Sequence, residues 1–210
     1  MKIAIMIRTV LTCIVLQFCS TIAVAEGQSP VMIPVPGKNY EIGKYEVTQA
    51  EWQAVMGYNP SKFRSCGQNC PVEKLSWNDI QEFIDKLNAM TGKKFRLPTG
   101  EEWEYACYGG KASTYCGGED LDALAWSSNN SERKTHPVGQ KLPNGYGLYD
   151  MAGNVDEWTE ECDEGDCTMR ILRGGGWDDD PQFSVATFKD RFIISGRNDD
   201  HGFRLARTLP

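Results

Sequence analysis

The sequence predicts an α+β domain, with helices mainly in the first half of the chain and short antiparallel strands in the second. Three helix-start signals fall between residues 48 and 102, each a Thr or Ser followed three residues later by an acidic residue. After about Gly109 the helical periodicity disappears, and Gly, Asn, Asp and Ser separate short apolar stretches such as Ile171-Leu172. This change of pattern is typical of short strands held between structured loops. No internal repeat divides the chain.

The first 25 residues have the layout of a secretory signal peptide. Lys2 and Arg8 give a basic start, residues 9–18 are largely apolar, and Ala23-Val24-Ala25 offers small residues to a signal peptidase. A membrane anchor is the alternative, but the apolar run is short for a bilayer span. We therefore expect a secreted or periplasmic protein without a membrane span after cleavage. Residues 26–38 would form an N-terminal segment and residues 39–208 the domain.

The charge of the chain argues against one class of partner. Cleavage would remove Lys2 and Arg8, leaving 20 basic residues against 29 acidic ones and a net charge of −9. Binding to nucleic acid depends on basic patches that neutralise phosphates. We therefore expect no nucleic-acid partner. The remaining 185 residues suit one domain with a sizeable core.

Six cysteines lie outside the leader, and they form three closely spaced pairs. These are Cys66 with Cys70, Cys107 with Cys116, and Cys162 with Cys167. In an oxidising compartment an even number of cysteines predicts disulfides. We expect each pair to bond locally and to hold an irregular loop, although other connectivities stay open. A metal site at Cys66 and Cys70 is disfavoured, because zinc would need two further ligands nearby.

The three helices share one start signal, the capping box, in which two side chains satisfy free amide groups of the first turn. The boxes are Thr48 with Glu51, Ser76 with Asp79, and Thr99 with Glu102. Gly57 and Gly92 are expected to end the first two helices. The second helix has apolar residues at the spacing of one buried face, namely Ile80, Phe83, Ile84 and Leu87. Five tryptophans are expected to anchor the core: Trp52, Trp77, Trp103, Trp126 and Trp158.

Six segments, taken in order, resemble the formylglycine-generating-enzyme (sulfatase-modifying factor) family. They are Ile42-Gly-Lys-Tyr-Glu-Val-Thr48, Phe95-Arg-Leu-Pro-Thr-Gly-Glu-Glu-Trp-Glu-Tyr-Ala106, His136-Pro-Val-Gly139, Asn144-Gly-Tyr-Gly-Leu-Tyr-Asp-Met-Ala-Gly-Asn-Val-Asp-Glu-Trp158, Leu172-Arg-Gly-Gly-Gly-Trp177 and Gly202-Phe-Arg-Leu-Ala206. The resemblance covers about residues 39–208. It implies a variant of the C-type lectin fold with little regular secondary structure.

The chain departs from this family where the family's chemistry takes place. The resemblance implies an oxidase that binds copper(I) through two cysteines, and thiolates suit copper(I) because both are soft. Residues 177–192 contain no cysteine, and Pro181 and Ala186 stand near the positions expected for the thiols. We therefore expect neither bound copper nor the copper-dependent reaction. Whether the chain is an enzyme at all stays open at this point.

Residues 149–157 resemble the calcium loop of the family. The resemblance implies that Asp150 and Glu157 bind calcium through their side chains, and that Gly153 and Val155 bind it through their carbonyl oxygens. Calcium takes six to eight oxygen ligands, backbone carbonyls among them. We expect a structural calcium ion. The alternative is an ordinary turn with solvated acidic side chains.

Four residues lie where the substrate groove of the family begins: Trp177, Asp178, Asp179 and Asp180. They are candidate ligand contacts or a second cation site, with a solvated acidic loop as the alternative. The favoured function is a calcium-stabilised binding or accessory module for a protein, peptide or saccharide outside the cytoplasm. One alternative is a protein-modifying oxidoreductase of this family that uses a site without cysteine. Another is a structural subunit of an envelope assembly.

Overall fold

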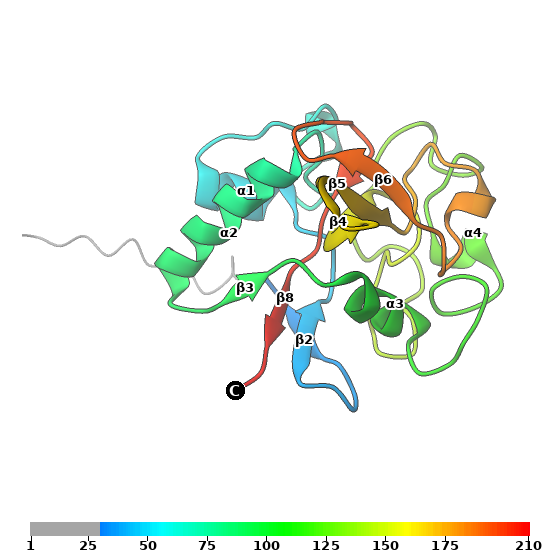
Figure 1. Ribbon diagram of the computed structural model, residues 1–210. Coiled ribbons are helices and arrows are strands. Elements are labelled where there is room, and N and C mark those ends of the chain that lie inside the picture. The colour runs from blue at the N-terminus through cyan, green and yellow to red at the C-terminus, as the bar shows by residue number, and fades with distance from the viewer. Residues whose placement is uncertain (1–29) are drawn as a thin grey trace, which may run out of the picture.

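The computed structural model describes residues 30–210, and it is an α+β fold as predicted (Figure 1). The proposed signal peptide, residues 1–25, lies outside the described residues. The α-helices are α1 (Gln49–Met56), α2 (Trp77–Thr91), α3 (Gly100–Tyr108) and α4 (Leu121–Leu124). The short α4 was not predicted. There are also two 3₁₀ turns among the described residues: η1 (Arg64–Cys66), between α1 and α2, and η2 (Pro181–Phe183), between β5 and β6.

The predicted helix boundaries are confirmed by their caps. Thr48, Ser76 and Thr99 each form a complete capping box with the acidic residue three positions on. The helices end at glycines with positive φ, Gly57 at 81° and Gly92 at 67°. The predicted face of α2 is buried, so both the ends and the orientation of this helix follow from local sequence.

The first sheet joins the two ends of the described chain. Its strand order is β1-β2-β8-β3, with bounds Met32–Pro34, Tyr40–Gly43, Ala206–Thr208 and Phe95–Arg96. The C-terminal strand β8 lies between β2 and β3 (Figure 1). Three of these strands precede Gly109, where the sequence had predicted mainly helices. They have two to four residues each, which is too short for an alternating pattern to be recognised.

The second sheet positions the buried acidic residues at the start of β4 and beside β7. Its order is β6-β5-β4-β7, with bounds Asp190–Ile193, Asp166–Arg173, Asp156–Asp163 and His201–Gly202. β4 and β7 pair in parallel, with Asp156 opposite His201 and Glu157 opposite Gly202. The expectation of antiparallel strands is therefore wrong for this pair. The parallel contact spans two residue pairs, and it brings the start of β4 beside the chain segment that leads into β8.

The core consists of two clusters of buried apolar side chains. In the first, Trp52 stacks on Phe83 with ring centroids 5.1 Å apart, and Phe203 packs against both rings. Trp103 lies in the second cluster and Trp158 in the first, both fully buried. Trp77 and Trp126 are only half-buried. Trp77 still packs against the first cluster, whereas Trp126 packs against neither, so the prediction is wrong for Trp126.

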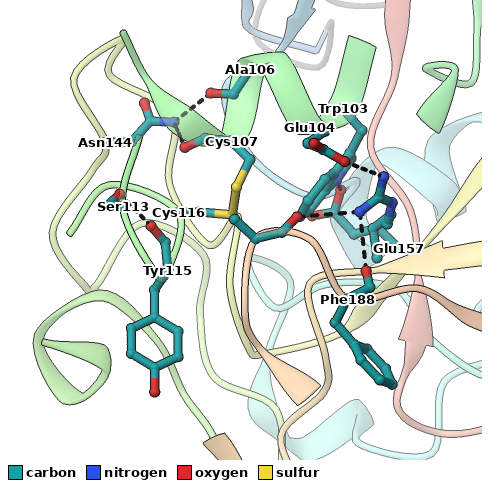
Figure 2. The surroundings of a disulfide bond; sticks show 12 residues. Trp103, Glu104, Ala106, Cys107, Ser113, Tyr115, Cys116, Asn144, Glu157 and Phe188 are labelled. Carbon is teal, nitrogen blue, oxygen red and sulfur yellow. Dashed lines mark hydrogen bonds and ion pairs between the residues drawn. A yellow bond between two sulfur atoms is a disulfide. The ribbon is translucent and has the colours of Figure 1, made fainter. Parts of the chain in front are cut away.

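All three predicted disulfides form between neighbours in the sequence: Cys66–Cys70, Cys107–Cys116 and Cys162–Cys167. Figure 2 shows Cys107 near the end of α3, with the Asn144 amide donating to the carbonyls of Ala106 and Cys107. Disulfides of this density are typical of oxidising compartments. Within residues 30–210 no helix is long and apolar enough to cross a bilayer.

Candidate functional site

The start of β4 carries a fully buried ion pair. Glu157 and Arg204 are at most 1% exposed, and Arg204 Nη2 lies 2.6 Å from Glu157 Oε1. Trp103 Nε1 donates to the other oxygen, Oε2, at 2.7 Å. The Arg204 guanidinium also donates to the carbonyls of Gly43, Tyr149 and Asp150 at 3.0 Å each. This arginine therefore links β2, the loop before β4 and the approach to β8.

Two further carboxylates are buried near this pair. Glu46 is 1% exposed and accepts from Asn154 Nδ2 at 2.6 Å and from the Val155 amide at 3.1 Å. Asp150 is 2% exposed, and its Oδ2 accepts from the Gly139 amide at 2.6 Å. Burial raises the pKa of Asp150 to about 6 and that of Glu46 well above its usual range. Three buried carboxyl groups therefore share one basic partner, Arg204, and burial disfavours the ionised forms of Glu46 and Asp150.

The calcium-loop residues occupy a tight turn. Asp150 and Asn154 both have positive φ, 52° and 65°, a conformation that Asp and Asn tolerate better than most residues. Gly153 has φ 71°, and a Cβ there would lie 2.3 Å from the Trp126 carbonyl oxygen. Asn154 accepts from the His136 amide and donates to its carbonyl. Only glycine fits position 153. The turn is therefore held by the close contact of Gly153 with Trp126 and by the hydrogen bonds of Asn154 with His136.

The four calcium candidates differ in how well they fit a cation. Asp150 fits, since its Oδ1 is buried and has no hydrogen-bond partner among the described residues. Glu157 already accepts from Arg204 at both oxygens and from Trp103 at one. Glu46 lies in the segment 42–48, whose pattern predicted no role for it, and is a third carboxylate close to them. Gly153 and Val155 flank Asn154 in the same turn.

The second candidate group, residues 177–180, forms a loop after three consecutive glycines. Trp177 is 7% exposed and its amide donates to the Asn154 carbonyl at 2.9 Å, which links this loop to the calcium turn. Asp179 accepts from the Gly176 amide at 2.7 Å, and Asp180 accepts from the Ser128 hydroxyl at 3.3 Å. Asp178 is exposed. The loop thus presents carboxylates toward solvent around a mostly buried indole.

Behind this loop lie two buried acids that sequence reasoning missed. Asp156 is 4% exposed and accepts from the Gly175 amide at 3.2 Å. Asp200 is 9% exposed, and its Oδ1 has no hydrogen-bond partner among the described residues. Burial, reinforced by Asp178, raises the pKa of Asp200 to about 7. Burial lowers the pKa of the adjacent His201 to about 4, so this imidazole is neutral at pH 7 and gives Asp200 no ion pair.

The positions expected for copper ligands hold no thiol. Pro181 begins η2, and Ala186 is buried with its amide donating to the Thr114 carbonyl. All six cysteines of residues 30–210 are used in disulfides. The residues present therefore do not fit a copper(I) dithiolate site. Across residues 30–210, no three His, Cys, Asp or Glu side chains form a group arranged to hold a metal ion.

Comparison with known proteins agrees with the fold. A family model described as sulfatase-modifying factor enzyme 1-like domain matches residues 21–209. The chain is 34% identical to a protein of Paenibacillus barcinonensis named chaperone protein LppX, covering 81% of this chain and 80% of that protein. It is 37% identical to the bovine protein named inactive C-alpha-formylglycine-generating enzyme 2, covering 65% of this chain and half of that protein.

Solved structures extend the same comparison. Treponema denticola variable protein 1 superposes with a TM-score of 0.76 at 30% identity, covering 87% of this chain and 92% of that one. PvdO from Pseudomonas aeruginosa superposes with a TM-score of 0.69 at 23% identity, covering 86% of this chain and 92% of that one. The second likeness concerns the fold alone.

Proposed function

The chain belongs to the sulfatase-modifying factor enzyme 1-like family, and we propose that it acts there as an exported binding or accessory module without the copper-dependent oxidase reaction. The observation that carries this proposal is the state of the cysteines. The six cysteines of residues 30–210 are bonded in disulfides, and residues 177–192 contain none. A soft metal ion such as copper(I) would find no thiolate there.

The relatives support a role without catalysis. One is named as a chaperone and another as an inactive member of the formylglycine-generating enzymes. Fold alone does not determine function, so these names count only together with the missing thiol pair. The proposed ligand is a protein, a peptide or a saccharide, and the proposed contact surface is the loop of residues 177–180.

Export is the second part of the proposal. The leader at residues 1–25 has the layout of a signal peptide. Three disulfides within residues 30–210 fit a protein that folds in an oxidising compartment. A secreted or periplasmic location accounts for both features.

We predict that the protein leaves a cysteine-containing sulfatase-type peptide unchanged. The peptide would be incubated aerobically with the mature protein, with and without copper, and followed by mass spectrometry. The expected spectrum shows only the starting mass, because there is no thiol pair to hold the metal beside the substrate cysteine. An active formylglycine-generating enzyme under the same conditions is the positive control. A mass loss that matches conversion of cysteine to formylglycine would show that the proposed function is wrong.

We also propose that calcium binds at the turn of residues 150–157. Asp150 is the best-supported ligand, because its buried Oδ1 has no partner among the described residues. A divalent cation there would favour the ionised forms of Asp150 and Glu46, whose pKa values burial raises in its absence. Glu157 would have to share its oxygens with Arg204, while the carbonyls of Gly153 and Val155 would complete the set. The ion would stabilise the turn and supply no catalysis.

Calcium is expected to raise the melting temperature of the wild-type protein and to lose this effect in Asp150→Asn. A ligand that binds only the folded state at 100 times its Kd stabilises it by about 2.7 kcal/mol. Asparagine keeps an acceptor for the Gly139 amide and tolerates positive φ, but it removes the charge. Without calcium the variant should be at least as stable as wild type, because ionising the buried Asp150 carboxyl is unfavourable.

Thermal denaturation with calcium and with a chelator measures both effects. Glu82→Gln, an exposed change on α2, is the matched control and should keep the full calcium response. Equal stabilisation of Asp150→Asn and wild type would place the ion elsewhere. No stabilisation of wild type by calcium would contradict the proposal.

A further inference from the structure

An aromatic pair borders the loop of residues 177–180. The rings of Phe63 and Trp177 meet edge to face with centroids 5.2 Å apart. The Trp177 indole N–H donates to the Asp199 carbonyl at 3.1 Å. On the other side, the Glu73 carboxylate accepts from the amides of Lys62 and Phe63 at 3.0 and 2.8 Å. The Trp177 ring is therefore held by its own hydrogen bond, and the backbone that carries Phe63 is held by Glu73.

A cation of the chain itself lies against this pair. The Lys62 ammonium lies 5.0 Å from the centre of the Phe63 ring and 5.8 Å from that of Trp177. It also forms an ion pair with the Asp199 carboxylate. These distances are within the range of cation–π attraction. Lys62 is 52% exposed at its side chain, so its head group can leave the position without unfolding any element.

The charged groups that act most strongly on Lys62 are acidic. The charges of Asp199, Glu73 and Asp178 all raise the pKa of Lys62, after its hydrogen bond to Asp199. Behind them lies the buried Asp200, whose Oδ1 has no partner among the described residues and whose Cβ lies against Gly176. The local field therefore favours a second cation in addition to Lys62, or one that replaces it.

Two pockets adjoin the aromatic pair. Trp177 and Asp178 line a pocket of about 350 Å³ together with Ser128, Ser131 and Arg133. Phe63 lines a pocket of about 270 Å³, which the segment 134–137 also lines. Residues 128–137 thus line both pockets, where Arg133 and Lys134 bring positive charge that the carboxylates around Lys62 do not share. A peptide crossing this face could place one side chain at the rings and its neighbours in the two pockets.

We propose that this face binds a lysine-bearing segment of a basic polypeptide, whose ammonium group takes the place of Lys62 between Asp199 and the rings of Phe63 and Trp177. The proposal rests on the proposed function as a binding module and names the chemistry of its partner. It commits to a cationic peptide because the two fixed features of the position, an aromatic pair and a carboxylate, are those that recognise an ammonium ion. A neutral saccharide would use neither the charge of Asp199 nor the position of Lys62.

The test uses the mature protein and an oligolysine peptide as the probe, with binding followed by titration calorimetry. Wild type should bind the probe, and added salt should weaken binding because exposed charges are screened. Asp199→Asn and Trp177→Leu should each weaken binding about tenfold, which corresponds to about 1.4 kcal/mol. Circular dichroism of each variant would check that it is folded.

The decisive variant is Lys62→Met, which removes the internal competitor while keeping a side chain of similar length. Binding of oligolysine should become about 3- to 10-fold tighter, since a site occupied by its own cation is available only part of the time. A general electrostatic attraction to an acidic surface would also strengthen when any lysine is removed. Lys86→Met on α2, where the lysine pairs with Glu82, controls for this and should leave the affinity within about twofold.

The outcomes separate the inference from the proposed function. Equal effects of Lys62→Met and Lys86→Met, or unchanged binding in Asp199→Asn, would overturn the cationic-peptide site. Tighter binding of a neutral oligosaccharide than of oligolysine at this face would overturn it as well. None of these results would bear on the missing oxidase reaction, which the mass spectrometry of the cysteine peptide tests separately.

Discussion

Replacing Arg204 with Met is expected to destabilise the protein by about 3–5 kcal/mol, because it leaves the Glu157 carboxylate buried without its counter-ion. The exposed fractions of the two side chains are 0% and 1%, so water cannot solvate the remaining charge. The substitution also removes the donors to the carbonyls of Gly43, Tyr149 and Asp150. Chemical denaturation followed by circular dichroism would measure the loss.

An exposed ion pair provides the matched control for this experiment. Arg197 pairs with Asp79 at 2.8 Å and its side chain is 52% exposed. Arg197→Met should cost at most about 1 kcal/mol, since solvent screens such pairs. If Arg204→Met does not fold, the double variant with Glu157→Gln should recover part of the stability, because it removes the uncompensated charge. A loss for Arg204→Met no larger than that for Arg197→Met would contradict the assigned role.

The parts of the fold that the sequence predicts are those determined by local interactions. The capping boxes at Thr48, Ser76 and Thr99 depend on residues three positions apart, and the buried face of α2 depends on a single helical period. The close cysteine pairs belong to the same class. Local rules therefore locate these elements well.

The pairing of β8 between β2 and β3 depends on residues far apart in the chain. Thr208 lies opposite Tyr40, and Arg207 lies opposite both Glu41 and Phe95. Strands of two to four residues carry too little pattern to reveal such partners. For the same reason nothing in the sequence identifies the parallel contact of β4 with β7, which places Asp156 beside His201.

The candidate site likewise has parts that the sequence predicts and parts that depend on contacts between distant segments. The resemblance to a family pointed to residues 150–157 and 177–180. The first range is a turn that runs into β4, the second is a loop, and the Trp177–Asn154 hydrogen bond joins them. The positions of Lys62 and Phe63 against Trp177 were missed, because no motif marks a contact between loops so distant in sequence. The burial of Asp200 was missed as well. An acidic residue in a polar loop gives no sign of burial until the strands pair.

Asp200 is the source of a pH dependence that a single substitution can isolate. Burial and the nearby Asp178 raise its pKa to about 7 in the folded protein, against about 3.9 in an unfolded chain. Between these values the folded state holds a proton that the unfolded state has released. Stability from this group is therefore fully present below about pH 4 and is lost as the pH rises through about 7.

Asp200→Asn removes this ionisation while keeping the size of the side chain. Relative to wild type, the variant should gain about 2–3 kcal/mol of stability between pH 5 and pH 8, measured as the difference in unfolding free energy at each pH. Other carboxyls titrate equally in both proteins and cancel in the difference. Asp85→Asn, an exposed change on α2, should shift stability by less than about 0.5 kcal/mol at either pH.

A constant difference between Asp200→Asn and wild type across this range would mean that the Asp200 carboxyl is not forced to ionise in an apolar setting. The difference in unfolding free energy between Asp200→Asn and wild type could instead widen with pH in calcium-free buffer and narrow when oligolysine is added. That result would have a more specific meaning. It would place the charge of Asp200 within reach of a cation bound at the aromatic pair. In that case the buried acid that destabilises the free protein at pH 8 would strengthen binding of its cationic partner, because one negative charge produces both effects.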